Sequence, residues 1–495
     1  MLVTEELVLK RFQKHKRAFL NQLEKNSFET ALVHANYACS LARRFPILED
    51  FVDLEIEAGL LKLGNKVVNL SEKETEKKGI LFFSSQTVDN GALTEQYLDY
   101  LIDRGEDYLY VTTDNQASQR GKRILSKTKE NVTIASEGVA QIKDLAGVIK
   151  DYNPSEIWIH LAPDHVEGYA ALSLFKKMTG LYIVHNSHSF WLGTDLVEKF
   201  TEFQMGGVYS SSRFRKIKES SLGLVPFYPI GVGEQKSEES KWLYTPRVTD
   251  GKTIALVSGN RLKILYPGAE GLLDALTQSL NSIPKLSIWI ATIGGQEEIK
   301  EYFKKQELLD RVKFLGYQKD LDKVLEQVDC LIDTFPFGGG LMRQIAIRNF
   351  KPVFRVSTQK LKGIYGTKEV YLSGDDFDSL NVKSFVTQLN RFSKEGLTKG
   401  QIGILKKLYY SFPDKKSFQE NMDRFRDGNL GYEINDIEGF SWDRKELLDL
   451  YLQFENMFNR RFFIEEVRQL KSRISIEGIF MAALQIPRVV LSKLR

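Results

Sequence analysis

Apolar positions recur at helical spacing through the first part of the chain. Between Ala31 and Ala42, small and apolar residues return every three or four positions, and residues 48–63 repeat this amphipathic pattern. Small residues on one helix face allow close packing against a neighbouring helix. We therefore interpret residues 1–78 as a helical module that packs on the rest of the chain or docks another protein.

The pattern changes at Gly79. From there, short apolar runs alternate with amphipathic segments such as residues 94–104. Runs of this length between helical segments predict a parallel sheet covered on both faces. The predicted strands are residues 80–84, 108–112, 132–134, 157–159 and 182–184. Together they define a Rossmann-like lobe over residues 79–235.

A polar, charged stretch over residues 231–252 interrupts this alternation and is typical of an interdomain linker. The alternation resumes with predicted strands at residues 253–257, 286–291, 312–314, 330–332 and 352–354. From about Lys399 helical periodicity returns. The pattern predicts an α/β protein with two Rossmann-like lobes facing a cleft: residues 79–235, residues 236–400, and a closing helical segment over 401–495.

Composition narrows the class of protein. Of 495 residues 42% are hydrophobic, enough for packed cores, and the formal net charge of +4 gives no field that would favour nucleic acid as a partner. Two cysteines, Cys39 and Cys330, cannot build a disulfide framework or a four-thiolate metal site. Residues 1–6 do not resemble a signal peptide, and no apolar run is long enough to span a bilayer. We expect a cytoplasmic protein.

Three consecutive glycines, Gly338 to Gly340, follow the predicted strand 330–332 and precede a helix that we expect to begin at about Leu341. Glycines leave backbone N–H groups uncovered, and a helix N-terminus adds partial positive charge. The loop is therefore a candidate site for a diphosphate. A tight strand-to-helix turn without a ligand is the alternative.

A basic loop follows the first strand of the same lobe and carries Asn260, Arg261 and Lys263. Because ligands bind at the carboxyl ends of parallel strands, these side chains could neutralise a departing diphosphate without a metal ion. A solvated basic loop is the alternative. The acidic turn Asp376-Phe-Asp378 could hold a metal–nucleotide complex, but we interpret it as the cap of a helix that starts near Leu380.

Histidines gather in the first lobe, where four of the six fall between positions 160 and 188. His160 and His185 directly follow strands, so we expect them to be buried. His165 and His188 lie further out on their loops and are our candidates for the base that takes a proton from an acceptor. We expect Asp164 or Glu167 to raise the pKa of His165. A structural histidine is the alternative at each position.

The common phosphate and zinc fingerprints are absent, which argues against P-loop NTPases, the usual nicotinamide dehydrogenases and zinc peptidases. Instead, the second lobe resembles the O-linked N-acetylglucosamine transferases and the related bacterial adhesin glycosyltransferases. These enzymes have two Rossmann domains (the GT-B architecture) and often an N-terminal helical module. The segments that carry the resemblance are residues 260–264, 312–318, 328–340 and 351–353.

The resemblance implies roles for individual residues. A Lys at the position of Lys263 contacts the diphosphate in that family. The segment containing Tyr317 holds the base of the nucleotide, and the loop with Phe337 and the three glycines holds the diphosphate. Asn260, Arg261 and Arg343 would assist. The chain departs from the family at Leu341 to Arg343, where Thr or Asn is usual, and it lacks the Glu that retaining enzymes place after the glycines.

The implied activity is metal-independent, inverting transfer of a hexose or N-acetylhexosamine from a nucleotide sugar, with UDP favoured, to a protein or glycan. No cofactor beyond the donor is expected. One alternative is a membrane-associated transferase of lipid-linked or surface polysaccharide synthesis, for which the basic, apolar tail 486–495 would touch the inner face of the membrane. The other is a non-catalytic binding module of the same architecture.

Overall fold

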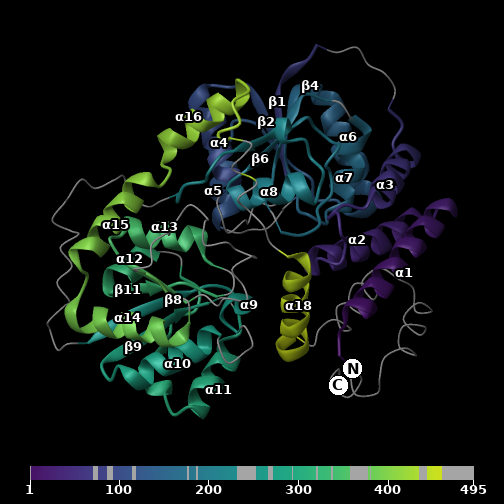
Figure 1. Cartoon of the computed structure of the whole chain (residues 1–495). Coiled ribbons are helices and arrows are strands. Elements are labelled where there is room, and N and C mark those ends of the chain that lie inside the picture. The colour runs from purple at the N-terminus through teal and green to yellow at the C-terminus, as the bar shows by residue number, and fades with distance from the viewer. Residues whose placement is uncertain are drawn as a thin grey trace. The chain divides into compact units, whose positions relative to one another are not determined.

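Two parallel sheets organise the chain, as the sequence predicts (Figure 1). The computed structural model describes residues 2–70, 76–85, 93–113, 119–175, 178–185, 188–230, 252–265, 271–292, 294–318, 321–335, 338–356, 377–379, 381–433, 437 and 443–459. The chain divides into two compact units: unit 1 comprises Met1–Pro226, Gln419–Glu438 and Arg444–Arg495, and unit 2 comprises Phe227–Phe418 and Gly439–Asp443.

Unit 1 contains a seven-stranded sheet in its described residues, in the order β3-β2-β1-β4-β5-β6-β7, with every pairing parallel. The central strands are apolar and buried because helices cover both faces. The strands are β1 (Lys78–Ser84), β2 (Tyr108–Thr112), β3 (Asn131–Thr133), β4 (Pro154–His160), β5 (Gly180–Ile183), β6 (Lys199–Glu202) and β7 (Leu222–Leu224). The predicted strands are confirmed, and β6 and β7 extend the sheet.

The helices of unit 1 come from both ends of the chain and from the connections between strands. They are α1 (Glu5–Glu24), α2 (Phe28–Arg44), α3 (Leu54–Val67), α4 (Leu93–Arg104), α5 (Gln119–Lys127), α6 (Gly138–Tyr152), α7 (Val166–Leu172), α8 (Met205–Arg213), α16 (Lys415–Arg426) and α18 (Arg444–Phe454), with short turns η1 (Ser173–Phe175) and η2 (Glu219–Ser221) and a π-helix, η6 (Glu455–Asn459).

Helices α2 and α3 pack onto α6 and α7, and α1 packs on α2 and α3, so all three belong to unit 1. Thr4 and Asp53 cap α1 and α3, each accepting a hydrogen bond from a backbone N–H in the first helical turn. Gly64 lets α3 approach α7 closely, since a Cβ there would lie 2.6 Å from the carbonyl oxygen of Ala170. The small residues of this module therefore serve helix packing, as their spacing predicts.

The C-terminal helix α18 is fastened to the N-terminal helices. The Asn456 side chain accepts a hydrogen bond from Val3 N at 2.6 Å and donates one to Val3 O at 2.8 Å. Arg44 forms an ion pair with the buried carboxylate of Glu455, and Arg444 donates to the carbonyl oxygen of Pro46 at 2.7 Å. These contacts fix α18 against the start of the chain.

Unit 2 contains a six-stranded parallel sheet in its described residues, in the order β10-β9-β8-β11-β12-β13. The strands are β8 (Thr253–Ser258), β9 (Leu286–Ala291), β10 (Val312–Phe314), β11 (Cys330–Ile332), β12 (Val353–Val356) and β13 (Asp378–Ser379). The helices are α9 (Arg261–Ile264), α10 (Leu272–Ser282), α11 (Gln296–Lys305), α12 (Leu321–Gln327), α13 (Gly340–Arg348), α14 (Val382–Glu395) and α15 (Lys399–Ser411), with a short turn η4 (Leu309–Arg311).

The first six strands of each sheet follow the same order as a doubly wound nucleotide-binding fold. In both sheets the first three strands are added toward one edge and the next three toward the other edge, which places a topological switch point between β1 and β4 and between β8 and β11. Ligands of such sheets bind outside the carboxyl ends of the strands at this point. Site residues are therefore expected in the loops that follow the strands at each switch point.

The expected cap at Asp376–Asp378 is wrong in its details. Asp378 begins strand β13, and the residue that caps α14 is Asn381, whose side chain accepts a hydrogen bond from Ser384 N at 2.8 Å. Asp376 lies outside the described residues. The acidic turn therefore leads into a strand, and the helix begins two residues later than expected.

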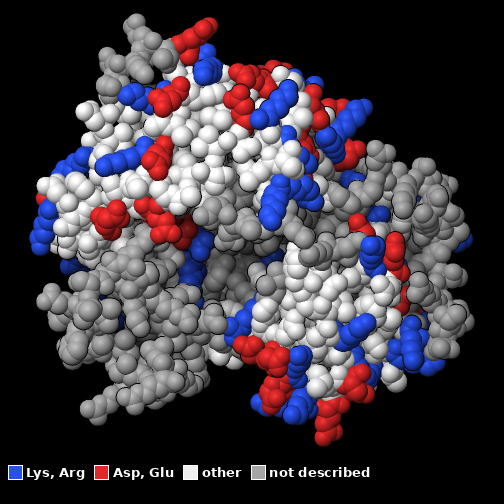
Figure 2. All heavy atoms as spheres, turned by 180° about the vertical axis from the view of Figure 1, so that it is seen from behind, with Lys and Arg blue, Asp and Glu red and all other residues white. Residues whose placement is uncertain are grey.

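The surface carries charges of both signs. Figure 2 shows Lys and Arg interspersed with Asp and Glu over the described part of one face. Among the described residues, none of the helices is both long and apolar enough to cross a bilayer. Cys39 and Cys330 are buried as free thiols.

Two glycines of unit 1 provide a matched test of this packing. A Cβ at Gly79 would lie 2.0 Å from the carbonyl oxygen of Asp107, the residue before β2, whereas a Cβ at Gly147 in α6 would meet nothing within 4 Å. We expect Gly79→Ala to destabilise the protein by about 2 kcal/mol or more, since the backbone must move. Gly147→Ala should stabilise it by about 0.5–1 kcal/mol. Urea unfolding of both variants checks this, and equal effects would contradict the strand register.

Candidate functional site

The switch point of the unit 2 sheet brings two predicted loops together. Asn260 to Lys263 follow β8. The glycine loop, Gly338 to Gly340, follows β11, which pairs with β8 in parallel. The contact is direct, since Lys263 Nζ donates a hydrogen bond to Gly338 O at 3.0 Å. Burial lowers the pKa of the Lys263 ammonium, while Asp333 nearby opposes that change.

Asn260 and Arg261 shape the basic loop. The Asn260 side chain accepts a hydrogen bond from Lys263 N at 3.1 Å and so caps the short helix α9. Arg261 Nη2 lies 2.7 Å from Glu298 Oε1 in an ion pair, and its methylenes lie against Gly295. Lys263 is the residue of the basic loop whose side chain bonds to the glycine loop directly.

The glycine loop is not as open as its sequence suggests. Gly339 N donates a hydrogen bond to Asp333 Oδ1 at 2.8 Å, and Thr334 N donates to the same oxygen at 2.9 Å. The expectation of three uncovered amides is therefore wrong at Gly339, because a buried carboxylate at the end of the strand already uses that N–H. Helix α13 begins at Gly340, one residue before the predicted start.

Arg343 projects from the first turn of α13 toward the same carboxylate. Its Nε lies 3.3 Å from Asp333 Oδ2, and both side chains are almost fully buried. Arg343 Nε and Nη1 are nevertheless without hydrogen-bond partners, as is Asp333 Oδ2. The side chains of Lys263, Arg343 and Asp333 thus form a charged cluster at the glycine loop, in which two nitrogens of Arg343 donate no hydrogen bond.

Tyr317, in the loop after β10, has 66% of its surface exposed. Such a ring is accessible to a planar ligand. Phe337 lies outside the described residues.

At the corresponding switch point of unit 1, three buried polar side chains are linked by hydrogen bonds. His160 Nδ1 lies 2.7 Å from Thr94 Oγ1, which lies 3.3 Å from Ser84 Oγ at the end of β1. The His160 and His185 rings are 5.5 Å apart, and burial lowers the pKa of both. His160 is fully buried, as expected, whereas the side chain of His185 is only partly buried.

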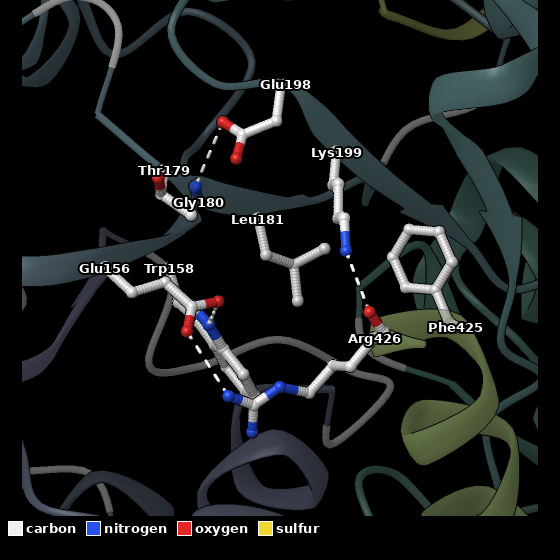
Figure 3. Close-up of a pocket in the computed structure, with 9 residues that line it drawn as sticks. All are labelled: Glu156, Trp158, Thr179, Gly180, Leu181, Glu198, Lys199, Phe425 and Arg426. Carbon is white, nitrogen blue, oxygen red and sulfur yellow. Dashed lines mark hydrogen bonds and ion pairs between the residues drawn. The ribbon is translucent and has the colours of Figure 1, made fainter. Parts of the chain in front are cut away.

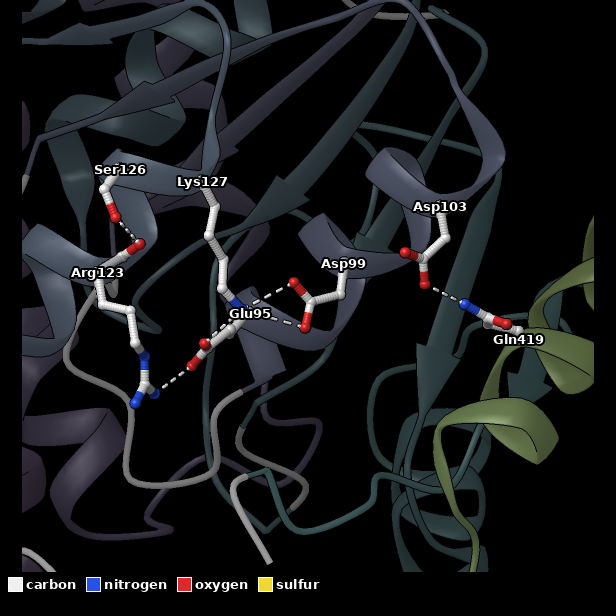
Figure 4. Close-up of polar contacts among 7 residues, drawn as sticks. All are labelled: Glu95, Asp99, Asp103, Arg123, Ser126, Lys127 and Gln419. Atoms are coloured by element: carbon white, nitrogen blue, oxygen red, sulfur yellow. Dashed lines mark hydrogen bonds and ion pairs between the residues drawn. The ribbon is translucent and has the colours of Figure 1, made fainter. Parts of the chain in front are cut away.

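The first turn of α4, which carries Thr94, is held by ion pairs to α5 (Figure 4). The Glu95 carboxylate is buried and accepts hydrogen bonds from Arg123 Nη2 at 2.5 Å and from Lys127 Nζ at 2.8 Å. Lys127 also bonds to Asp99 one turn later at 2.9 Å. These bonds fix the position of Thr94 relative to His160.

His165 is held within its own unit. Its Nε2 lies 3.0 Å from Gln141 Oε1, and its ring lies so close over Gly168 that a Cβ there would be 2.3 Å from Nδ1. The expectation of a raised pKa is wrong: burial lowers the pKa of His165 and outweighs Glu167 and Asp164. Asp164 instead forms an ion pair with Arg43.

His188 is only partly buried and meets a residue from the C-terminal helix. Its Nε2 lies 3.2 Å from Tyr451 Oη. Burial raises the pKa of Tyr451 well above its usual value, so the phenol stays protonated near neutral pH. Tyr451 therefore restrains the His188 ring without adding charge.

A buried network anchors the loop that carries His188. Arg215 Nη2 donates to Ser189 O at 2.6 Å, and Nη1 donates to Ser211 Oγ at 3.0 Å. Ser211 Oγ in turn donates to Glu202 Oε1 at 2.5 Å. Burial raises the pKa of Glu202 to about 7, although Arg215 opposes the change. The orientation of the histidine loop thus depends on a carboxyl group at the end of β6.

A pocket of about 190 Å³ lies at the opposite, amino edge of the unit 1 sheet (Figure 3). Each of its charged side chains already bonds a neighbour. Arg426 bonds Glu156, Lys199 Nζ donates to Arg426 O at 3.0 Å, and Glu198 accepts from Gly180 N at 3.1 Å. The pocket is the joint between α16 and the sheet. Among the described residues, no group of three or more His, Cys, Asp and Glu side chains could hold a metal ion.

Comparison with solved structures identifies the fold. A mutant of the Thermobaculum terrenum O-GlcNAc transferase matches with a TM-score of 0.52 at 10% identity, over 89% of this chain and 85% of that one. Anabaena HepE in complex with UDP and glucose matches with a TM-score of 0.52 at 14% identity, over 71% of this chain and 100% of that one. The chain has the GT-B fold. No family model matches the sequence, and no curated protein matches it significantly.

Several residues of this GT-B chain were not found from the sequence. Asp333 had a usable signal, because it is the last residue before the loop and sits at the carboxyl end of a buried strand. Gln141, Glu202, Arg215 and Tyr451 gave none, since each reaches its partner only through folding.

The raised pKa of Glu202 predicts a specific pH dependence. Folding raises this pKa from 4.5 to about 7, so the folded GT-B chain keeps a proton that the unfolded chain releases. Stability is therefore lost as pH rises from about 4.5 to 7. Glu202→Gln, whose amide oxygen can still accept from Ser211, should lack this loss and gain about 3 kcal/mol over wild type between pH 5 and 8.

Urea unfolding at several pH values measures this difference, with Glu198→Gln on the surface as the control. A difference between wild type and Glu202→Gln that is the same at pH 5 and pH 8 would contradict the assignment.

Proposed function

We propose that this protein is a glycosyltransferase that takes its sugar from a nucleotide diphosphate, with UDP favoured. The observation that carries the proposal is the meeting of Lys263 and Arg343 at the N-terminus of α13, at the switch point of the unit 2 sheet. Cations beside a helix N-terminus form a site for a diphosphate. The solved complex of HepE with UDP and glucose, which shares the fold, supports the same ligand class.

In the proposed reaction the diphosphate is the leaving group, and negative charge grows on it as the bond to the sugar breaks. Lys263 and Arg343 supply positive charge at that point, so the chemistry proposed here needs no metal ion. Asn260 keeps Lys263 in place by capping α9. Arg261 would assist only after leaving Glu298, with which it is paired.

Inverting transfer also requires a base for the acceptor hydroxyl or amide. The acceptor attacks the anomeric carbon on the face opposite the diphosphate, and its proton passes to the base. We assign this role to His188, which is partly exposed and restrained by Tyr451. His165 is the second candidate, because burial lowers its pKa and makes it a weaker base.

A protein or a glycan is the proposed acceptor, and a hexose or an N-acetylhexosamine the proposed sugar. The O-GlcNAc transferase among the matched structures supports an N-acetylhexosamine as the sugar. For a protein acceptor, the N-terminal helices would offer a docking surface. The tail 486–495, which motivated a membrane-associated alternative, lies outside the described residues.

Calorimetric titration with UDP and GDP, followed by turnover assays with a panel of nucleotide sugars, tests the proposal. Binding of a nucleotide together with hydrolysis or transfer of one sugar is expected. Nucleotide binding without turnover would indicate a binding module, and the absence of binding would refute a nucleotide site.

Lys263→Ala should lower the transfer rate by roughly 10²–10³-fold, because one of the charges that stabilise the departing diphosphate is removed. Lys300→Ala is the matched control, since Lys300 lies on α11 of the same unit, where it pairs with Glu297 and lies over the Phe314 ring. Steady-state kinetics and melting temperatures of both variants separate activity from folding. Activity of Lys263→Ala within a few-fold of wild type would refute the assigned role.

His188→Asn should reduce transfer by about 10²–10⁴-fold with unchanged affinity for UDP, because the amide cannot accept a proton at neutral pH. His165→Asn is the comparison and should keep most of the transfer rate. Transfer kinetics with titration of UDP distinguish the two. If both variants keep full activity, the base lies elsewhere.

A further inference from the structure

Asp333 occupies the place that an anion would take at the glycine loop. Its Oδ1 accepts hydrogen bonds from Gly339 N at 2.8 Å and from Thr334 N at 2.9 Å. Gly339 is the residue that precedes the nine-residue helix α13, where partial positive charge concentrates. The carboxylate is therefore bound in the way that a phosphate oxygen would be.

The surrounding cations are not fully satisfied by Asp333. Arg343 is 4% exposed, yet its Nε and Nη1 are without hydrogen-bond partners and its Nε lies 3.3 Å from Asp333 Oδ2. Buried donors left unpaired are costly, and a second anion with suitable oxygens would satisfy them. The cluster is thus built to accept a further anion, with Asp333 already in place.

The charges of the cluster set a preference among such anions. Lys263 and Arg343 together with Asp333 leave a single net positive charge at the loop. A nucleotide sugar carries one ionised oxygen on each phosphate, whereas the free nucleoside diphosphate has a further terminal ionisation with a pKa of about 6. The product therefore brings about one more negative charge near Asp333 than the donor does.

We propose that Asp333 is a specificity-determining residue of the donor site, whose carboxylate weakens binding of the nucleoside diphosphate product more than binding of the nucleotide sugar. The Asp333 carboxylate thereby favours release of the product and binding of the next donor molecule. The proposal rests on the proposed function and concerns the same site. Lys263 and Arg343 attract both ligands, and Asp333 distinguishes between them by repulsion.

Asp333→Asn isolates the charge, because the amide oxygen can accept the same two backbone hydrogen bonds. The matched control is Asp329→Asn, at the other end of β11, where Asp329 Oδ2 accepts from Ile254 N at 2.8 Å. Calorimetric titration measures the dissociation constants of UDP, UDP-glucose and UDP-N-acetylglucosamine for the full-length wild type and both variants.

For Asp333→Asn we expect UDP to bind roughly tenfold more tightly, on the scale of one charge removed at short range. The nucleotide sugar that binds should gain by a smaller factor, and Asp329→Asn should match wild type. Unchanged or weaker binding of UDP to Asp333→Asn, or equal gains for UDP and the nucleotide sugar, would overturn the proposal.

A second measurement uses the methyl ester of UDP on its terminal phosphate, which lacks the extra ionisation. Asp333→Asn should tighten the binding of UDP by a larger factor than the binding of this ester, and equal factors would overturn the proposal. If wild type binds none of these ligands, the proposed function fails together with this inference. Binding of UDP without discrimination refutes the role of Asp333 alone.

Discussion

The parallel pairing of β8 with β11 is the constraint on which the candidate donor site depends. Because parallel strands end at the same edge of a sheet, their pairing brings Lys263 to Gly338, 75 residues along the chain. Helices on both faces bury this sheet, so the loops at its edge gather charge in a partly dry environment. Each cation placed there then needs a compensating partner.

Both units meet that need with a carboxyl group at the end of a strand. In unit 2 Asp333 follows β11 and faces Arg343, and in unit 1 Glu202 ends β6 and is linked to Arg215 through Ser211. The two solutions differ in consequence. Asp333 lies on the loop where an anion is expected, whereas Glu202 acts at a distance by holding the loop of His188.

The elements of the fold were largely predictable, and the exceptions have physical reasons. Strands such as β1 and β9 contain the apolar runs Ile80–Phe83 and Ile288–Ala291, as buried parallel strands do, and these runs are visible in the sequence. Strand β6 was missed because Lys199, Thr201 and Glu202 interrupt its apolar character. Strand β13 has only two residues, too few to give a period.

The sequence by itself determined where the site residues could lie, since alternating strands and helices direct attention to the loops at strand ends. Only the tertiary structure decided what those residues do. The Gly339 N–H donates a hydrogen bond to Asp333, and the His188 ring is hydrogen-bonded to Tyr451, 263 residues away. A local pattern records backbone propensity and burial over a few residues. Hydrogen bonds and charge balance between distant segments depend on strand order and helix packing, which no local pattern contains.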